Sequence, residues 1–143
     1  MRVLGLDVGE SRIGVALSDP LGMMASALTV IGVKSTESAI QEILGLVAQY
    51  EVERIVVGLP RSLDGSIGKQ AQSVLDFVEL LSQRTSVPVA TWDERLSTVA
   101  AERVLLEAGT KREKRRQHRD AVAAAIVLQA YLDRERIQAS TQD

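Results

Sequence analysis

The chain has 143 residues, of which 45% are hydrophobic and 25% are charged; 17 Lys and Arg against 19 Asp and Glu give a net charge of −2. This balance is typical of one globular domain with a substantial core, and it argues against nucleic-acid binding by bulk positive charge. The absence of cysteine excludes disulfides, zinc–thiolate sites and a thiol nucleophile.

The sequence also shows no membrane or export segment. No apolar run approaches the roughly 20 residues needed to span a bilayer, and the N-terminus lacks the charged-then-apolar order of a signal peptide. We therefore expect a cytoplasmic protein with no membrane partner. One domain is expected over residues 1–137, followed by a frayed polar tail over residues 138–143.

Three strands are predicted at the start of the chain, over residues 2–8, 12–18 and 25–33. In the second strand, Ile13 and Val15 lie on the face opposite the small residues that alternate with them. The short, turn-rich connections between the three strands favour antiparallel pairing.

Helices and strands then alternate. The predicted elements are a helix capped by Ser35 or Thr36, a strand over 54–59, a polar loop over 60–68, a helix over 69–83, a strand over 87–92, a helix from Ser97 or Thr98 to Gly109, and a helix over 120–136. Three antiparallel strands followed by βα units predict an α/β fold. We expect a mixed five-stranded sheet with helices on both faces.

Acidic side chains occur at points that this fold brings together. Asp7 lies near the end of a buried strand, Asp93 and Glu94 follow the fifth strand, and Asp120 begins the last helix. Ligand sites of open sheets form at the carboxyl ends of parallel strands. Converging carboxylates repel one another unless a cation joins them, and hard oxygen ligands favour Mg²⁺ or Mn²⁺. Such a site can hydrolyse a phosphodiester.

Each of these acids also has a purely structural explanation. Asp7 could accept hydrogen bonds from the turn that follows it, and Asp93 could form a surface ion pair with Arg95. Asp120 could complement the dipole of the helix that it begins. Coincidence of all three is the less economical explanation, so we favour the metal site.

Basic residues near the acids are candidates for binding phosphate. Residues 111–119 hold six Lys and Arg residues in nine positions, directly before Asp120. Such a run is often only a solvated loop, but its position beside an acid of the site favours a role with nucleic acid. The predicted nucleic-acid-binding residues are Arg12, Lys69, Arg95, Lys111, Arg112, Lys114, Arg115, Arg116 and Arg119. The role of His118 stays open.

Four motifs together resemble those of the YqgF/RuvX family. They lie in residues 6–19, 57–66, 93–98 and 120–132, and the resemblance covers nearly the whole chain. It implies an RNase H-like fold related to the RuvC resolvases. It further implies a nuclease that trims the 5′ end of pre-16S rRNA, although family members are also described as Holliday junction resolvases. The acidic residues of the family carry over to Asp7, Asp93 or Glu94, and Asp120.

The sequence departs from the RuvC-type arrangement at two positions. That arrangement has a carboxylate on the fourth strand, which here reads Val57-Gly58-Leu59 and has none, and a second acid on the last helix, where this chain has Ala123. The middle ligand must then follow the fifth strand. Strand alternation sends Asp93 and Glu94 to opposite faces, and we favour Glu94 because of its longer reach.

We therefore predict a nuclease that uses Mg²⁺ or Mn²⁺ and acts on structured RNA; the resemblance implies precursor rRNA or a ribosomal subunit precursor as its partner. The catalytic residues would be Asp7, Asp120 and either Glu94 or Asp93. Two alternatives remain. One is a resolvase of branched DNA, which would have to be a homodimer rather than a monomer. The other is a non-catalytic RNA- or ribosome-binding module.

Overall fold

The computed structural model of the protein describes residues 1–62, 64–96 and 119–142. The helix predicted between residue 97 or 98 and Gly109, and the basic residues 111–118, lie outside this range. No helix in the described part of the chain is long and apolar enough to cross a membrane.

The described elements follow the predicted order. They are β1 (Val3–Val8), β2 (Arg12–Ser18), β3 (Ala25–Gly32), α1 (Thr36–Gln49), β4 (Arg54–Leu59), α2 (Lys69–Arg84), β5 (Val89–Asp93), the 3₁₀ turn η1 (Glu94–Leu96) and α5 (Arg119–Gln142). Ser35 caps α1 by accepting a hydrogen bond from the backbone N–H of Ser38 at 3.0 Å. The last helix extends beyond the predicted 120–136. No glycine or proline interrupts the segment up to Gln142, which includes most of the predicted tail.

The strands form one five-stranded sheet in the order β3-β2-β1-β4-β5. β1 pairs antiparallel with β2, and β2 pairs antiparallel with β3. β4 is parallel to both β1 and β5. The carboxyl ends of β1, β4 and β5 therefore share one edge of the sheet, as the prediction of a mixed sheet requires.

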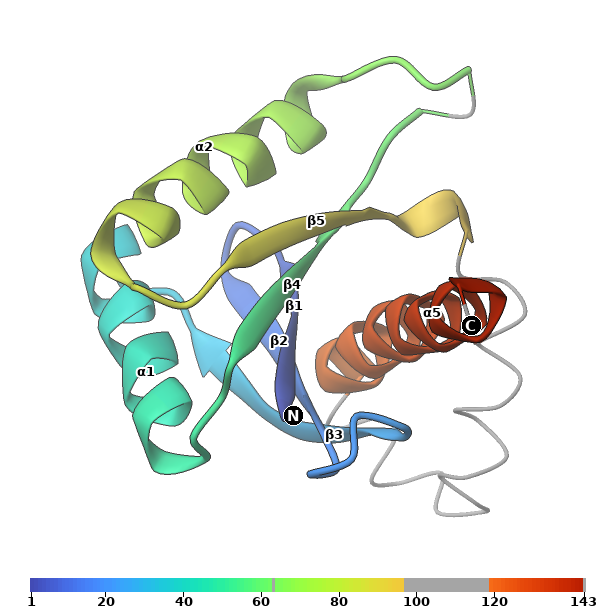
Figure 1. The fold of residues 1–143 in the computed structure, drawn as a ribbon. Coiled ribbons are helices and arrows are strands. Elements are labelled where there is room, and N and C mark those ends of the chain that lie inside the picture. The colour runs from blue at the N-terminus through green and yellow to red at the C-terminus, as the bar shows by residue number, and fades with distance from the viewer. Residues whose placement is uncertain (63, 97–118, 143) are drawn as a thin grey trace.

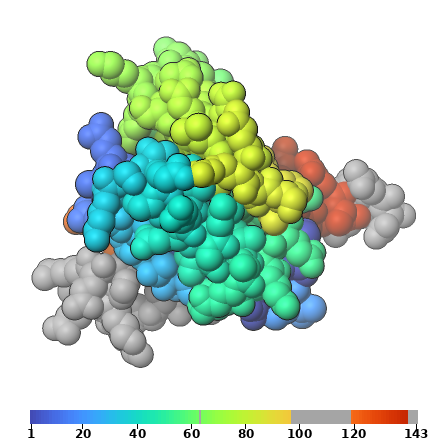
Figure 2. All heavy atoms as spheres, turned by 90° about the vertical axis from the view of Figure 1, so that its left-hand side faces the viewer, coloured from blue at the N-terminus to red at the C-terminus, as the bar shows by residue number. Residues whose placement is uncertain are grey.

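The two faces of the sheet are covered by different helices, with α1 and α2 on one side and α5 on the other (Figure 1). Alternating residues of β2 join two separate cores. Ile13 and Val15 pack in the core that includes residues of α1 and α2, whereas Ala16 packs with α5. The surface of the first face is formed by α1 and α2 (Figure 2).

A buried glutamine joins α5 to the connection between β2 and β3. The side chain of Gln129 is fully buried, accepts a hydrogen bond from the backbone N–H of Ala25 at 2.9 Å and donates one to the backbone oxygen of Met23 at 3.0 Å. These bonds satisfy polar groups that burial would otherwise leave unpaired. They also fix the position of α5 along the sheet.

Candidate active site

The acidic residues singled out in the sequence all lie along the shared edge of the sheet. Asp7 is the penultimate residue of β1, Asp93 is the last residue of β5, and Asp120 lies in the first turn of α5. β4 separates β1 from β5, and its last residue, Leu59, pairs with Asp93. A side chain that follows β5 must therefore extend across the end of β4 to reach Asp7.

Glu94 makes this connection. Its carboxyl group lies within hydrogen-bonding reach of that of Asp7, an arrangement that favours one proton shared by the two acids. Burial, together with the charge of Asp7, raises the pKa of Glu94 to about 7. Burial also raises the pKa of Asp7, against the lowering effect of the bond with Glu94 and with a further increase from the charge of Asp120. Both acids are thus held in a place where being charged is unfavourable.

The space for Glu94 comes from a glycine on β4. A Cβ atom added to Gly58 would lie 2.6 Å from Oε1 of Glu94 and 3.1 Å from Cγ2 of Val127. Real Cβ atoms essentially never show a contact as short as the one with Glu94, so any larger residue at position 58 would displace the carboxyl group. The space beside Gly58 on β4 is therefore occupied by a carboxylate that comes from the turn after β5.

Asp93 belongs to a different group of charges. It accepts hydrogen bonds from the backbone N–H of Arg95 at 3.0 Å and from the guanidinium Nη2 at 2.6 Å. The hydrogen bond from the Arg95 side chain lowers the pKa of Asp93, the opposite direction from that of Glu94. Of the two neighbouring acids, it is Glu94 that contacts Asp7. Asp93 instead forms an ion pair with Arg95, which is the non-catalytic role considered for it from the sequence.

Asp120 reaches the site because α5 lies very close to β2. A Cβ atom added to Gly14 would lie 1.8 Å from the backbone oxygen of Asp120, and Gly14 is the residue of β2 that pairs with Asp7. The Asp120 carboxylate forms an ion pair with Arg12, whose Nε lies 2.9 Å from Oδ2. Asp120 is close enough to affect the pKa of Asp7, but its present partner is a cation from the chain itself.

Among the described residues, no three acidic or histidine side chains are arranged so that they could hold a metal ion. The chemistry of the donors nevertheless fits a divalent cation, because two hard oxygen ligands are already held together at an electrostatic cost that a cation would relieve. A third carboxylate would become available if Asp120 left Arg12.

The structure places the predicted phosphate-binding residues at several separate points, and only some of them lie beside the acids. Arg12 contacts Asp120, and Arg95 contacts Asp93. Lys69 begins α2 and lines a pocket on the face opposite Asp7, and Arg119 is exposed at the start of α5. The other predicted residues, Lys111, Arg112, Lys114, Arg115 and Arg116, lie outside the described residues, as does His118.

The sequence did not single out the ionic contacts between the loop after β4 and the end of β5. Arg61 donates to the backbone oxygen of Gly65 at 3.0 Å through Nε, and its charge helps to lower the pKa of Asp93. The nearby charge of Arg95, after the hydrogen bonds from Ser66, lowers the pKa of Asp64. Only contact in space reveals these partners, since no spacing pattern links the two segments.

Comparisons with known proteins agree with this architecture. The model of the RuvX family, described as "Holliday junction resolvase", matches residues 1–134. A protein of Halothermothrix orenii named "Putative pre-16S rRNA nuclease" is 52% identical over 133 residues, which are 93% of this chain and 95% of that protein. A protein of the same name from Clostridium acetobutylicum is 50% identical over 93% of this chain and 98% of its own length.

Solved structures support the fold. RuvC of Thermus thermophilus in complex with a Holliday junction substrate is 19% identical, with a TM-score of 0.65 over 94% of this chain and 96% of its own. The fowlpox virus resolvase in complex with Holliday junction DNA is 9% identical, with a TM-score of 0.57 over 93% of this chain and 97% of its own. The predicted RNase H-like fold is confirmed, and the chain belongs to the RuvX family of nucleases, which are hydrolases of phosphodiester bonds.

Proposed function

We propose that Asp7, Glu94 and Asp120 bind a divalent cation, Mg²⁺ or Mn²⁺, and that this site cleaves RNA. The observation that carries the proposal is the hydrogen-bonded pair of Asp7 and Glu94 at the carboxyl edge of the sheet. A bound cation would activate water and stabilise the charge that develops on the phosphate. Two half-buried acids held in contact beside a third acid form a set of oxygen donors that a divalent cation would neutralise.

Arg12 has two roles in this proposal. In the protein alone it neutralises Asp120, with Nε 2.9 Å from Oδ2. When Asp120 turns to the cation, the guanidinium of Arg12 becomes free to bind a phosphate of the substrate. Arginine suits this exchange because its fork of N–H donors fits carboxylate and phosphate equally well.

The substrate that the relatives favour is pre-16S rRNA. Two proteins that match this chain over nearly their whole length carry that substrate in their name. We assign the chain to 5′-end processing of this precursor in the cytoplasm, where a ribosomal subunit precursor would be its partner. Arg119 and the basic residues that precede it would bind the RNA backbone.

Branched DNA is the second candidate substrate, since the RuvX family is described as a Holliday junction resolvase. The same carboxylates would carry out the hydrolysis, so the chemistry of the site does not separate the two substrates. The two candidates can be distinguished by measuring how fast the protein cleaves each substrate.

The test uses an end-labelled RNA that spans the 5′ boundary of 16S rRNA and a labelled four-way DNA junction, each with Mg²⁺, with Mn²⁺ or with EDTA. Asp7→Asn and Glu94→Gln should each lower the cleavage rate about 10²-fold or more, because each removes a charged ligand. Asp93→Asn is the matched control and should keep activity within a few-fold. Equal cleavage by the wild type, Asp7→Asn and Glu94→Gln would refute the site.

The pattern of products completes the assignment. Preferential cleavage of the RNA supports rRNA processing, and preferential, symmetric cleavage of the junction supports a resolvase. Tight RNA binding with no cleavage under any metal condition would instead support a non-catalytic binding module.

A further inference from the structure

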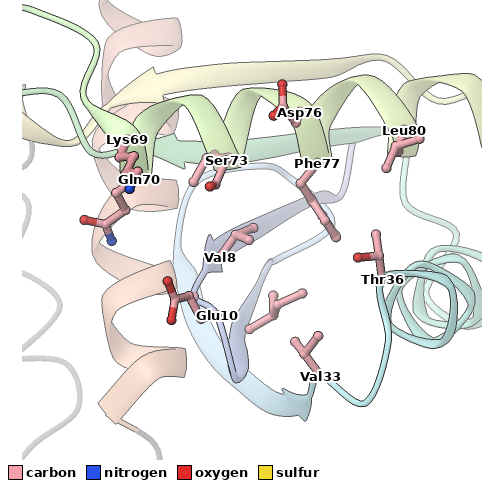
Figure 3. A pocket seen from close by; sticks show the side chains of 13 residues that line it. Val8, Glu10, Val33, Thr36, Lys69, Gln70, Ser73, Asp76, Phe77 and Leu80 are labelled. Carbon is pink, nitrogen blue, oxygen red and sulfur yellow. The ribbon is translucent and has the colours of Figure 1, made fainter.

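A pocket of about 620 Å³ lies at the same end of β1 as Asp7, on the opposite face of the sheet. Its walls come from the turn after β1, from the start of α1 and from the first part of α2 (Figure 3). Val8, which lines this pocket, follows Asp7 directly in β1. Consecutive Cα atoms are 3.8 Å apart, so the pocket and the acids are neighbours across the edge of the sheet.

The floor of the pocket is apolar and includes an aromatic ring. Val8, Ile13 and Val74 are among the lining residues. The ring of Phe77, which is 8% exposed, points from α2 toward the strands (Figure 3). The volume lies within the range of small-molecule sites, which are mainly apolar with a few polar groups at the border. A flat, largely apolar group with polar edges fits such a surface.

The polar border of the pocket favours a base rather than a phosphate. Lys69 is one cation among the lining residues, but Glu10 also lines the pocket, so a phosphate inside would meet negative charge. Asp76 lines the pocket as well, but its carboxyl group points away from the strands and accepts a hydrogen bond from Gln72 at 3.0 Å (Figure 3). Ser73, Gln70 and the carboxylate of Glu10 are instead suited to hydrogen bonds with the N–H and C=O groups on the edge of a base.

From these features we propose that the pocket binds one unpaired nucleobase of the nucleic-acid chain whose phosphodiester lies at Asp7 and Glu94. The proposal rests on the proposed function, since the same chain must reach both places. Unpaired bases are recognised by contact with aromatic side chains and by hydrogen bonds to their edges. Lys69 begins α2 at the border of the pocket and would bind a phosphate beside the captured base.

The charge of Glu10 predicts a preference among bases. A carboxylate accepts hydrogen bonds and donates none, so it favours adenine, cytosine and guanine, which carry an exocyclic amino group. Uracil has no such group and can offer the carboxylate only its ring N3–H. Pocket occupancy should therefore be lower for uracil than for the other three bases.

The first experiment measures binding of a labelled single-stranded RNA in EDTA, where no cleavage takes place. One abasic residue is moved along the RNA, one position at a time. At one position the wild type should lose about 5-fold or more in affinity, the range expected for loss of one stacked base. The proposal is overturned if no position changes the affinity by more than 2-fold.

Two substitutions on α2 localise the effect. Ser73 is exposed and lines the pocket, whereas Ser82 is exposed on the same helix and is not among the lining residues. Ser73→Trp should fill the pocket and abolish the position-dependent loss, and the smaller Ser73→Leu should weaken it. Ser82→Trp should behave like the wild type. A position-dependent loss that survives both changes at Ser73 would place the base elsewhere and refute the proposal.

Amide NMR with small probes separates the base from the phosphate. Adenosine monophosphate should shift the resonances of Val8 and Ser73, uridine monophosphate should shift them less, and ribose 5-phosphate should leave them in place. Equal shifts with ribose 5-phosphate would mean that the pocket takes a phosphate, which overturns the proposal.

Failure of the pocket and failure of the proposed function give different results. If no substrate is cleaved but the position-dependent loss in EDTA is present, the nuclease assignment fails and the pocket stands. If RNA is cleaved but the loss is absent, the pocket fails and the nuclease assignment stands.

Discussion

Asp7 and Glu94 share a hydrogen bond between their carboxyl groups, although β4 separates the strands from which they come. Such a bond requires a proton, so the pair is stable when protonated and is ready to exchange that proton for a cation. Stability and metal binding should therefore depend on pH in opposite directions.

The metal-free protein should lose stability as pH rises from about 5 to 8. The pKa of Glu94 rises from 4.5 to about 7 on folding, so the folded state binds more protons than the unfolded state within that interval. Unfolding by urea at several pH values measures the slope. Glu94→Gln should flatten it, and Asp93→Asn should not, because the pKa of Asp93 is lowered. An unchanged slope in Glu94→Gln would contradict the shared proton.

Binding of Mg²⁺ or Mn²⁺ should strengthen as pH rises through about 7, because the metal must displace the proton of the acid pair. Isothermal titration calorimetry in two buffers of different ionisation enthalpy should detect proton release at pH 6. At pH 8.5 the release should nearly vanish. Proton release that is the same at both values would show that Glu94 is not a ligand.

Gly58→Ala should reduce nuclease activity more than it reduces stability. The added Cβ meets the flexible end of Glu94, which can move away, but a displacement of about 1 Å at a catalytic group can cost 10²-fold in rate. Gly45→Ala is the control, since nothing lies within 4 Å of a Cβ at that helical glycine. It should raise the free energy of unfolding by about 0.5–1 kcal/mol and leave the rate unchanged.

Gly14→Ala should damage the fold itself. Here the added Cβ would lie 1.8 Å from the backbone of Asp120, so the start of α5 must move. We expect a loss of about 1–3 kcal/mol or more, measured by urea unfolding, together with loss of activity. Gly32→Ala tests whether any glycine in the sheet is equally sensitive. It has open space around its Cβ and should change stability by no more than about 0.5 kcal/mol.

Arg12→Ala should raise KM for the nucleic acid while leaving stability nearly unchanged. The Arg12 side chain is 59% exposed, and ion pairs this exposed contribute at most about 1 kcal/mol. Arg84→Ala removes another exposed arginine, the partner of Glu37, and serves as the control. It should leave KM as in the wild type. An equal rise in KM for both variants would indicate a general effect of charge.

The strands and their pairing could be predicted from the sequence because they depend on patterns among neighbouring residues. The alternation in β2 assigned Ile13 and Val15 to one face, and the structure buries both against the α1 and α2 side. The turn-rich connections predicted the antiparallel strands, which pair as expected. A period of two residues is visible without any knowledge of distant contacts.

The details of the candidate site depend on contacts that the sequence does not contain. Strand alternation predicted opposite directions for Asp93 and Glu94, but Glu94 leaves β5 and enters the turn η1. The absence of an acid at position 58 was visible, whereas the use of that space by Glu94 was not. The contact of Gly14 with α5 links residues more than 100 positions apart, and no sequence pattern reveals such a distance.

The carboxyl group of Glu94 above Gly58 also bears on how acidic residues can be compared between related nucleases. A carboxylate that one strand lacks can be delivered from its neighbour, so the same point in space is served by different positions in the chain. Two proteins aligned residue by residue would then differ in their acids although each brings a carboxylate to this edge of the sheet. A glycine facing the acids on the middle strand marks the places where such an exchange has room to occur.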